Sequence, residues 1–190
     1  MQKGMLIILS GPSGVGKGTV REELFKDESL NLAYSISMTT RQPREGERNK
    51  IDYFFVEEDE FKKKIDEGSL LEWAQFVDNY YGTPKEYVDE LLEAGKNVVL
   101  EIEVQGALQV MAKCPDALTI FIVPPSMEEL EKRIRGRRTE LEEVVQKRLA
   151  KARKEIATKD EYKYVVENDT VIKAKDQIAK IIREHKINQG

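Results

Sequence analysis

A glycine-rich segment near the start of the chain has the residue types and spacing of a phosphate-binding loop. Residues 11–17 read Gly-Pro-Ser-Gly-Val-Gly-Lys: a glycine, four residues, then Gly-Lys. The glycines let successive backbone N–H groups turn inward around a phosphate, in conformations that a Cβ would obstruct. Lys17 supplies a mobile positive charge for the outer phosphates, and the helix expected after the loop adds its positive N-terminal end.

The string alone can arise by chance, so the segments on either side decide what it means. Residues 5–9 (Met-Leu-Ile-Ile-Leu) form a short apolar run, as expected for a strand buried on both faces of a parallel sheet, and helical spacing follows over 19–26. A strand before and a helix after are what a P-loop requires. We therefore predict a nucleoside triphosphate site whose ATP-binding residues include Gly11, Pro12, Ser13, Gly14, Val15, Gly16, Lys17, Gly18 and Thr19.

One position of the loop departs from the usual pattern. The residue after the lysine is commonly Ser or Thr, whose hydroxyl helps to hold Mg²⁺, but this chain has Gly18 followed by Thr19. Direct ligation from that position is lost, although Thr19 can still donate to an inner phosphate and waters can hold the metal. The Gly-Lys-Gly-Thr variant resembles that of nucleoside monophosphate kinases such as adenylate kinases.

The elements that position the loop follow an alternating order. Apolar runs over 97–102 and 118–123 are each followed by a helical pattern, over 107–112 and 127–134. Strands that alternate with helices predict an α/β fold with a doubly wound parallel sheet flanked by helices. Ser126 is expected to cap its helix, with Glu129 completing a capping box.

Two segments interrupt this alternation. Residues 34–84 contain strand-like pieces over 34–39, 53–56 and 71–77 and a helical pattern over 58–67, which predict a small inserted α+β subdomain. Residues 135–140 lie between two amphipathic helices, the second over 142–157, and are rich in arginine. That composition suits a mobile lid.

Composition and charge restrict the classes of function. The chain has 190 residues and a net charge of −4, which predict a single cytoplasmic domain without the basic face of a nucleic-acid binder. No apolar run approaches the roughly 20 residues that cross a bilayer. Cys114 and His185, each the only residue of its type, are expected to be structural or solvated. The sequence leaves the oligomeric state open.

A second set of motifs lies in the inserted segment. Arg41 and Arg44 are three residues apart among hydroxyl side chains, a pairing that can hold a phosphate bidentately, although a solvated basic turn is the alternative. The strings Asp-Tyr-Phe-Phe, Glu-Trp-Ala-Gln-Phe and Asn-Tyr-Tyr-Gly-Thr follow at 52–55, 72–76 and 79–83. With these motifs the sequence closely resembles the guanylate kinase family, from the P-loop through to Asn168.

The resemblance implies a GMP site. In that family the matching arginines and tyrosines bind the phosphate of GMP, and the residues that match Ser37, Glu72 and Thr83 read the guanine. Guanine presents N1–H and N2–H₂ donors beside the O6 acceptor, so a carboxylate pairs with the donors while a hydroxyl donates to O6. The residues implied to bind GMP are Ser37, Arg41, Arg44, Tyr53, Glu72, Tyr81, Thr83 and Glu103.

The resemblance also implies roles for residues at the end of the strand over 98–103 and in the predicted lid. Glu101 and Glu103 stand where family members often have aspartates; Glu101 is expected near the Mg²⁺ water shell and Glu103 near the GMP base or ribose. Arg133 and Arg137 match lid arginines that close over the ATP phosphates, and Arg148 matches one at the position of phosphoryl transfer. Arg138 replaces a common glycine, and Asn168, after a strand expected over 164–166, is expected to contact adenine. The implied catalytic residues are Lys17, Arg41, Arg137 and Arg148.

The function implied is ATP-dependent phosphorylation of GMP to GDP in purine nucleotide metabolism, with Mg²⁺, ATP and GMP (and dGMP) as its small-molecule partners. A core of residues 1–33 and 85–190 would carry a GMP-binding subdomain over about 34–84 and a lid over about 133–148. Two alternatives stay open: a non-catalytic interaction module of the same fold, although these have a degraded phosphate loop, and a kinase for another nucleoside monophosphate, which Glu72 and Thr83 disfavour.

Overall fold

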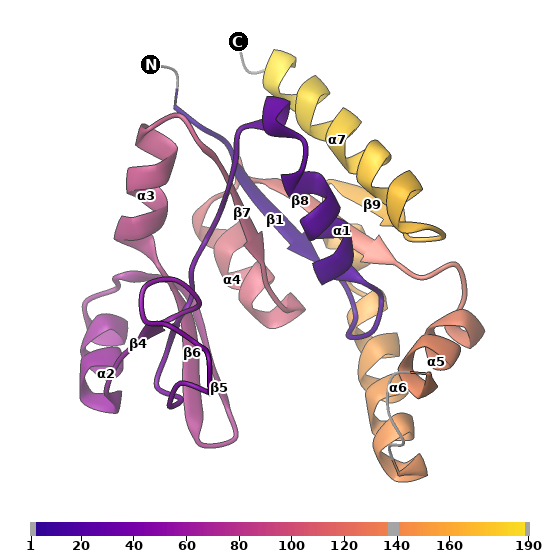
Figure 1. The fold of residues 1–190 in the computed structure, drawn as a ribbon, viewed down its shortest axis with the longest axis horizontal. Helices are drawn as coiled ribbons and strands as arrows, with labels where there is room; N and C mark the ends of the chain where they lie inside the picture. Colours follow the sequence, from indigo (N-terminus) through magenta and orange to yellow (C-terminus); the bar gives the residue numbers. More distant parts are fainter. Residues whose placement is uncertain (1–2, 137–140, 189–190) are drawn as a thin grey trace. The chain divides into compact units, whose positions relative to one another are not determined.

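The computed structural model describes residues 3–136 and 141–188, and it divides the chain into two compact units (Figure 1). Unit 1 comprises the described residues up to Leu6 together with Ala33–Leu100 and Gln105–Ala117. Unit 2 comprises Ile7–Leu32, Glu101–Val104 and the described residues from Leu118 onward. Unit 1 thus contains all of residues 34–84 and further elements besides.

Parallel strands form the centre of unit 2. The strands β1 (Leu6–Ser10), β8 (Leu118–Val123) and β9 (Tyr164–Glu167) lie in that order, and β8 is parallel to both of its neighbours. Ile8, Leu118 and Ile120 are fully buried, as expected for strands covered on both faces.

Helices accompany these strands. They are α1 (Lys17–Phe25), α5 (Met127–Arg135), α6 (Glu142–Ile156) and α7 (Val171–Asn188), with short 3₁₀ helices η1 (Glu28–Leu30) and η2 (Lys159–Glu161). Helix α7 packs against α1, and the two are drawn close together in Figure 1. Ser126 caps α5 as predicted, because its Oγ accepts a hydrogen bond from the Glu129 N–H at 3.1 Å. The Glu129 carboxylate lies 3.4 Å from Arg133, one turn further along the same helix.

Unit 1 is built around a four-stranded sheet in the order β4-β3-β6-β5. Its strands are β3 (Met38–Thr39), β4 (Phe54–Phe55), β5 (Leu70–Phe76) and β6 (Asn79–Pro84). Strand β6 is antiparallel to β3 and β5, whereas β3 and β4 are parallel. Met38, Phe61 and Leu70 form the buried cluster beneath this sheet.

The remaining elements of unit 1 are three helices and two strands, of which the first residue of one strand (Leu32) and the last residue of the other (Glu101) belong to unit 2. Helices α2 (Glu58–Asp66) and α3 (Lys85–Glu93) belong to it entirely, and α4 (Val104–Lys113) does so from its second residue. Strands β2 (Leu32–Tyr34) and β7 (Asn97–Glu101) are neighbours in a sheet. Among the residues that the structure describes, none of the helices is long and apolar enough to cross a membrane.

The strands predicted over 5–9, 97–102 and 118–123 are confirmed, but the strand predicted over 34–39 is wrong. The chain instead changes sheets there: the Ser35 N–H donates to the Val99 carbonyl at 3.1 Å, next to β2, whereas Met38 pairs with β6. Strand β6 and helix α3 were not predicted as elements. Pairing with segments distant in sequence decides which secondary structure such short segments adopt, and the local sequence pattern does not reveal that pairing.

Candidate active site

The backbone of the P-loop depends on its glycines in two ways. Gly14 has φ +86° and Gly16 has φ +97°, which lie in the left-handed region that side chains disfavour. Neighbouring side chains also leave no room for a Cβ: one added at Gly14 would lie 2.9 Å from the Ile134 side chain, and one added at Gly16 would lie 2.7 Å from Asn168 Nδ2. The strand, loop and helix expected around the motif are confirmed. They enclose a pocket of about 330 Å³ lined by Gly11, Pro12, Ser13, Gly14, Gly16, Lys17, Gly18, Thr19, Glu101, Ile102, Glu103 and Glu155.

Lys17 folds back over its own loop. Its Nζ donates to the Gly11 carbonyl at 2.5 Å and lies 3.4 Å from the Pro12 carbonyl. Burial lowers the pKa of the Lys17 ammonium, and the carboxylates of the same pocket, above all that of Glu101, oppose this shift. The ammonium therefore occupies a position from which it can swing toward a phosphate.

Three glutamates line the pocket, and each has a different environment. Glu101 Oε2 lies 2.6 Å from Arg21 Nε, and Glu103 lies 3.0 Å from Lys151 Nζ. Glu155 is 9% exposed, and its Oε2 has no hydrogen-bond partner within the described part of the chain. Burial raises the pKa of Glu155, an effect that Lys151 at 3.6 Å opposes.

Two of the described arginines of the predicted lid region, one on each of two helices, contact the loop or the residues beside it. Arg133, on α5, donates through Nη2 to the Asn168 carbonyl at 3.0 Å and lies 3.4 Å from the Val15 carbonyl. Arg148, on α6, reaches Ser13 Oγ at 3.2 Å. Arg137 and Arg138 lie outside the described residues, so their predicted roles stay predictions.

Asn168 holds the far side of the loop. Its side chain is 3% exposed, and Nδ2 donates to the Val15 carbonyl at 2.7 Å. Its backbone N–H donates to the Val123 carbonyl at 2.9 Å, which fixes it at the end of the β8–β9 pair. The amide of Asn168 thus supports the P-loop, a role that the sequence did not reveal; its contact with adenine stays a prediction.

Unit 1 brings together two of the three residues predicted to read the guanine. Glu72 on β5 and Thr83 on β6 are register partners, 7% and 1% exposed respectively. Thr83 Oγ1 donates to Glu72 Oε1 at 2.6 Å. Burial raises the pKa of the Glu72 carboxyl, and the bond from Thr83 partly offsets that rise. A buried, hydrogen-bonded carboxylate is suited to pair with the N–H donors of a ligand.

The predicted phosphate residues lie nearby in the same unit. Arg41 lies over the Tyr53 ring, 5.4 Å from its centroid; its hydrogen bonds with Glu47 do most to raise the pKa of Arg41, and Tyr81 adds to that rise. Two nitrogens of Arg41 each donate to a different oxygen of Glu47 at 2.9 Å, and the Arg44 N–H donates to Glu47 at 2.7 Å. These bonds, led by those from Arg41, lower the pKa of Glu47.

Two further predicted GMP residues are placed differently. Ser37 is half-buried just before β3, and its carbonyl accepts from the Phe54 N–H at 2.8 Å. Glu103 belongs to unit 2 and lines the P-loop pocket, so its contact with a GMP base or ribose stays a prediction.

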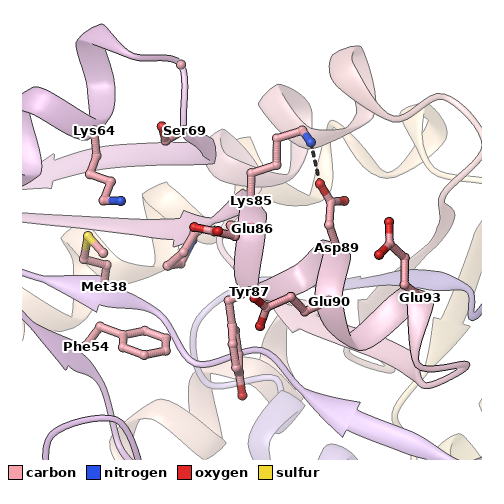
Figure 2. A pocket seen from close by; sticks show the side chains of 12 residues that line it. Met38, Phe54, Lys64, Ser69, Lys85, Glu86, Tyr87, Asp89, Glu90 and Glu93 are labelled. Carbon is pink, nitrogen blue, oxygen red and sulfur yellow. Dashed lines mark hydrogen bonds and ion pairs between the residues drawn. The ribbon is translucent and has the colours of Figure 1, made fainter.

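A larger pocket of unit 1, of about 650 Å³, contains none of the predicted site residues (Figure 2). Phe54 and Met38 line one side of it, and an ion pair between Lys85 and Asp89 crosses another. Cavity size therefore does not identify the site in this protein.

Sequence reasoning missed Glu47 and Glu155. Glu47 directly follows the Gly46 turn, where the chain needs φ +87°, and it is an anion close to two predicted phosphate arginines. Glu155 lies seven residues after Arg148, which places both on one face of α6. Attention to charges of opposite sign at turn or helical spacing would have found each of them.

The two sites define a class of protein: an α/β P-loop protein that binds nucleotides. A family model described as guanylate kinase matches residues 3–185. A guanylate kinase of Bacillus cereus is 56% identical over 97% of this chain and 90% of its own length, and one of Bacillus subtilis is 55% identical over 97% and 91%. The crystal structure of guanylate kinase from Anaplasma phagocytophilum matches with a TM-score of 0.74 at 34% identity, over 96% of this chain and 86% of that one. The chain belongs to the guanylate kinase family.

Proposed function

We propose that this protein is a nucleoside monophosphate kinase that transfers the γ-phosphoryl group of ATP to GMP, giving ADP and GDP, with Mg²⁺ accompanying the ATP. The observation that carries the proposal is the buried Glu72–Thr83 pair, joined at 2.6 Å, in a chain of the guanylate kinase family. dGMP has the same base and phosphate and is expected to serve as well.

Glu72 selects guanine through its charge and burial. Its carboxylate accepts from N1–H and N2–H₂ of the base, neither of which adenine presents. With AMP the carboxylate would stay buried and incompletely paired, which can be worth several powers of ten in discrimination. Thr83 already donates its hydroxyl proton to Glu72, so Ser37 is the hydroxyl that we assign to O6.

Arg41 and Arg44 bind the GMP phosphate, together with the hydroxyls of Tyr53 and Tyr81. Arg41 has donors beyond those that face Glu47, because a guanidinium carries five N–H groups. Glu47 therefore serves to hold the arginine in place while its other edge faces the phosphate. The attacking atom is a phosphate oxygen that already carries negative charge, so no general base is required.

The P-loop and the arginines around it bind ATP. The loop N–H groups and the N-terminus of α1 surround the phosphates, and Lys17 leaves the Gly11 carbonyl to reach them. Arg148, which already contacts Ser13, stabilises charge on the moving phosphoryl oxygens, as does Arg137, which lies outside the described residues. Arg133 and Asn168 support the loop on its other side.

The residues of the pocket fit a metal ion that arrives with the nucleotide. Within residues 3–136 and 141–188, no group of three or more histidine, cysteine, aspartate or glutamate side chains is arranged to hold a metal ion. Glu101 is the carboxylate closest to Gly18, at 3.8 Å from the position of a Cβ there, and it would hold a water of the ion. Mg²⁺ keeps several waters and neutralises phosphate charge in such sites.

The units that bear these residues are proposed to act as a core of residues 1–33 and 85–190, a GMP-binding subdomain over about 34–84 and a lid over about 133–148. In-line transfer requires the two phosphates to meet with water excluded, which closure of such segments achieves in kinases.

A coupled assay of ADP formation tests the proposal. We expect turnover with ATP, Mg²⁺ and GMP or dGMP, and rates at least about a hundredfold lower with AMP or UMP. Lys17→Met should lose most of the turnover and keep its fold by circular dichroism. Absence of GMP-dependent ADP formation would support a non-catalytic module instead, and equal use of AMP would overturn the assigned role of Glu72.

A further inference from the structure

A glycine occupies a place in helix α4 where the helix itself does not require one. Gly106 is the third residue of α4 and is buried. Alanine is favoured over glycine inside a helix by about 1 kcal/mol, so a side chain at this position would be expected to help the helix. Something other than the backbone of α4 must exclude it.

The excluded volume is filled by the carboxylate of Glu72. A Cβ at position 106 would lie 2.6 Å from Glu72 Oε2, 3.1 Å from its Cδ and 3.4 Å from its Cγ. The first distance is shorter than real Cβ contacts show. Since the nearest atom is the end of a flexible side chain, the carboxylate would move away and leave the position in which Thr83 bonds it.

Helix α4 cannot easily withdraw to relieve the contact. Gln109 is bonded to the outer edge of β5 in both directions: its Nε2 donates to the Trp73 carbonyl at 2.9 Å, and its Oε1 accepts from the Trp73 N–H at 3.1 Å. Lys113 Nζ donates to the Leu70 carbonyl at 2.9 Å. Positions 106, 109 and 113 share one face of the helix, so this face is fixed to β5 where Glu72 projects.

We infer that Gly106 is a specificity-determining residue, which positions Glu72 for guanine by leaving the space that its carboxylate occupies. The inference rests on the proposed function, because the consequence for catalysis requires that Glu72 read the base. Gly106 touches no reacting atom in this scheme. It acts through Glu72, and its loss moves the carboxylate from the 2.6 Å bond with Thr83.

Gly106→Ala tests the inference through kinetics. We expect the KM for GMP to rise at least about tenfold, the KM for ATP to stay within about twofold, and the preference for GMP over AMP to fall. Gln105→Ala, at an exposed neighbouring position of the same helix, is the matched control and should keep wild-type values. A Gly106→Ala enzyme with the wild-type KM for GMP and undiminished preference would overturn the inference.

Thermal unfolding of four proteins supplies a readout that does not depend on activity: wild type, Gly106→Ala, Glu72→Ala and the double variant. Without the Glu72 carboxylate, the Gly106→Ala change should raise Tm by about 2 to 4 °C, because only the helix preference remains. In the wild-type background the same change should give no gain, or a loss.

The inference would be overturned if Gly106→Ala changed Tm equally in the wild-type and Glu72→Ala backgrounds. It would also be overturned if neither variant that carries Gly106→Ala folded. If the wild type shows no GMP-dependent ADP formation, the proposed function fails instead, and the four melting temperatures still decide whether positions 72 and 106 compete for one volume.

Discussion

Replacement of Thr83 by valine would isolate the hydrogen bond on which base recognition depends. Valine has nearly the shape of threonine and lacks its hydroxyl, so Thr83→Val removes the donor that lies 2.6 Å from Glu72 Oε1 and leaves the packing nearly unchanged. Both residues are buried, at 1% and 7% exposure, so water cannot readily replace the lost bond. The carboxylate would then be free to adopt other rotamers.

The structure sets the size of the effect. A hydrogen bond to a charged group contributes about 1.5 to 3 kcal/mol, and each 1.4 kcal/mol is tenfold in an equilibrium constant. We therefore expect the KM for GMP to rise about tenfold to a hundredfold, and the KM for ATP to change by less than about twofold. Tm should fall by about 3 to 12 °C, since each kcal/mol shifts the Tm of a chain of this size by roughly 2 to 4 °C.

The pH dependence of kcat/KM for GMP provides an independent test of the same bond. GMP binding needs the Glu72 anion, whose pKa burial raises and the Thr83 bond lowers. Without that bond the pKa rises further, so the acid limb of kcat/KM for GMP should move to higher pH in Thr83→Val.

Steady-state kinetics over a range of pH would measure both effects, with Thr83→Ser, which keeps the hydroxyl, as the control. A Thr83→Val enzyme with an unchanged KM for GMP and an unmoved acid limb would refute the assignment of this pair to the base.

Three further predictions concern the phosphate site, the P-loop and a turn. Glu47→Gln should raise the KM for GMP about tenfold, because it weakens the bonds that hold Arg41 in place. Glu45→Gln, at an exposed position in the same turn, is the control and should leave this KM unchanged. Tighter GMP binding in Glu47→Gln would instead show that Glu47 competes with the phosphate for Arg41. Asn168→Ala should raise the KM for ATP about five- to tenfold through loss of the 2.7 Å bond to the loop, with Asp169→Ala unchanged as the control. Val77 has φ 56° at the β5–β6 turn and is 73% exposed, so Val77→Asn should raise Tm by about 2 to 4 °C in a thermal melt, and an unchanged Tm would contradict this.

The parts of the fold that the sequence predicted are those whose structure is dictated locally. Residues 5–9 are all apolar, and residues 118–123 are apolar except for Thr119. Short runs of this kind are typical of strands covered on both faces, so β1 and β8 could be identified. Ser126 could be identified as a cap because its side chain bonds the N–H three residues ahead. Strand β4 lies within the piece predicted over 53–56, whereas the two-residue strand β3 carries no such pattern, since its pairing depends on partners distant in sequence.

The candidate site shows the same division. The P-loop could be predicted because the backbone conformation of one short segment requires its glycines. The contact between Glu72 and Gly106 could not, because it joins a strand to a helix more than thirty residues later and depends on the absence of a side chain. The bond from Asn168 to the P-loop is likewise a tertiary contact, made by a residue whose type alone indicates only a turn or a cap.

The position of Lys17 has a consequence for competition among anions. An anion that enters the P-loop must draw the ammonium away from the Gly11 carbonyl, 2.5 Å distant, before it gains the charge. A triphosphate offsets this exchange with many loop N–H contacts, whereas inorganic phosphate or a lone sulfate makes few of them. The bond between Lys17 and the Gly11 carbonyl thus weakens the binding of small anions more than that of nucleotides, so that nucleotides can occupy the loop in the presence of smaller anions.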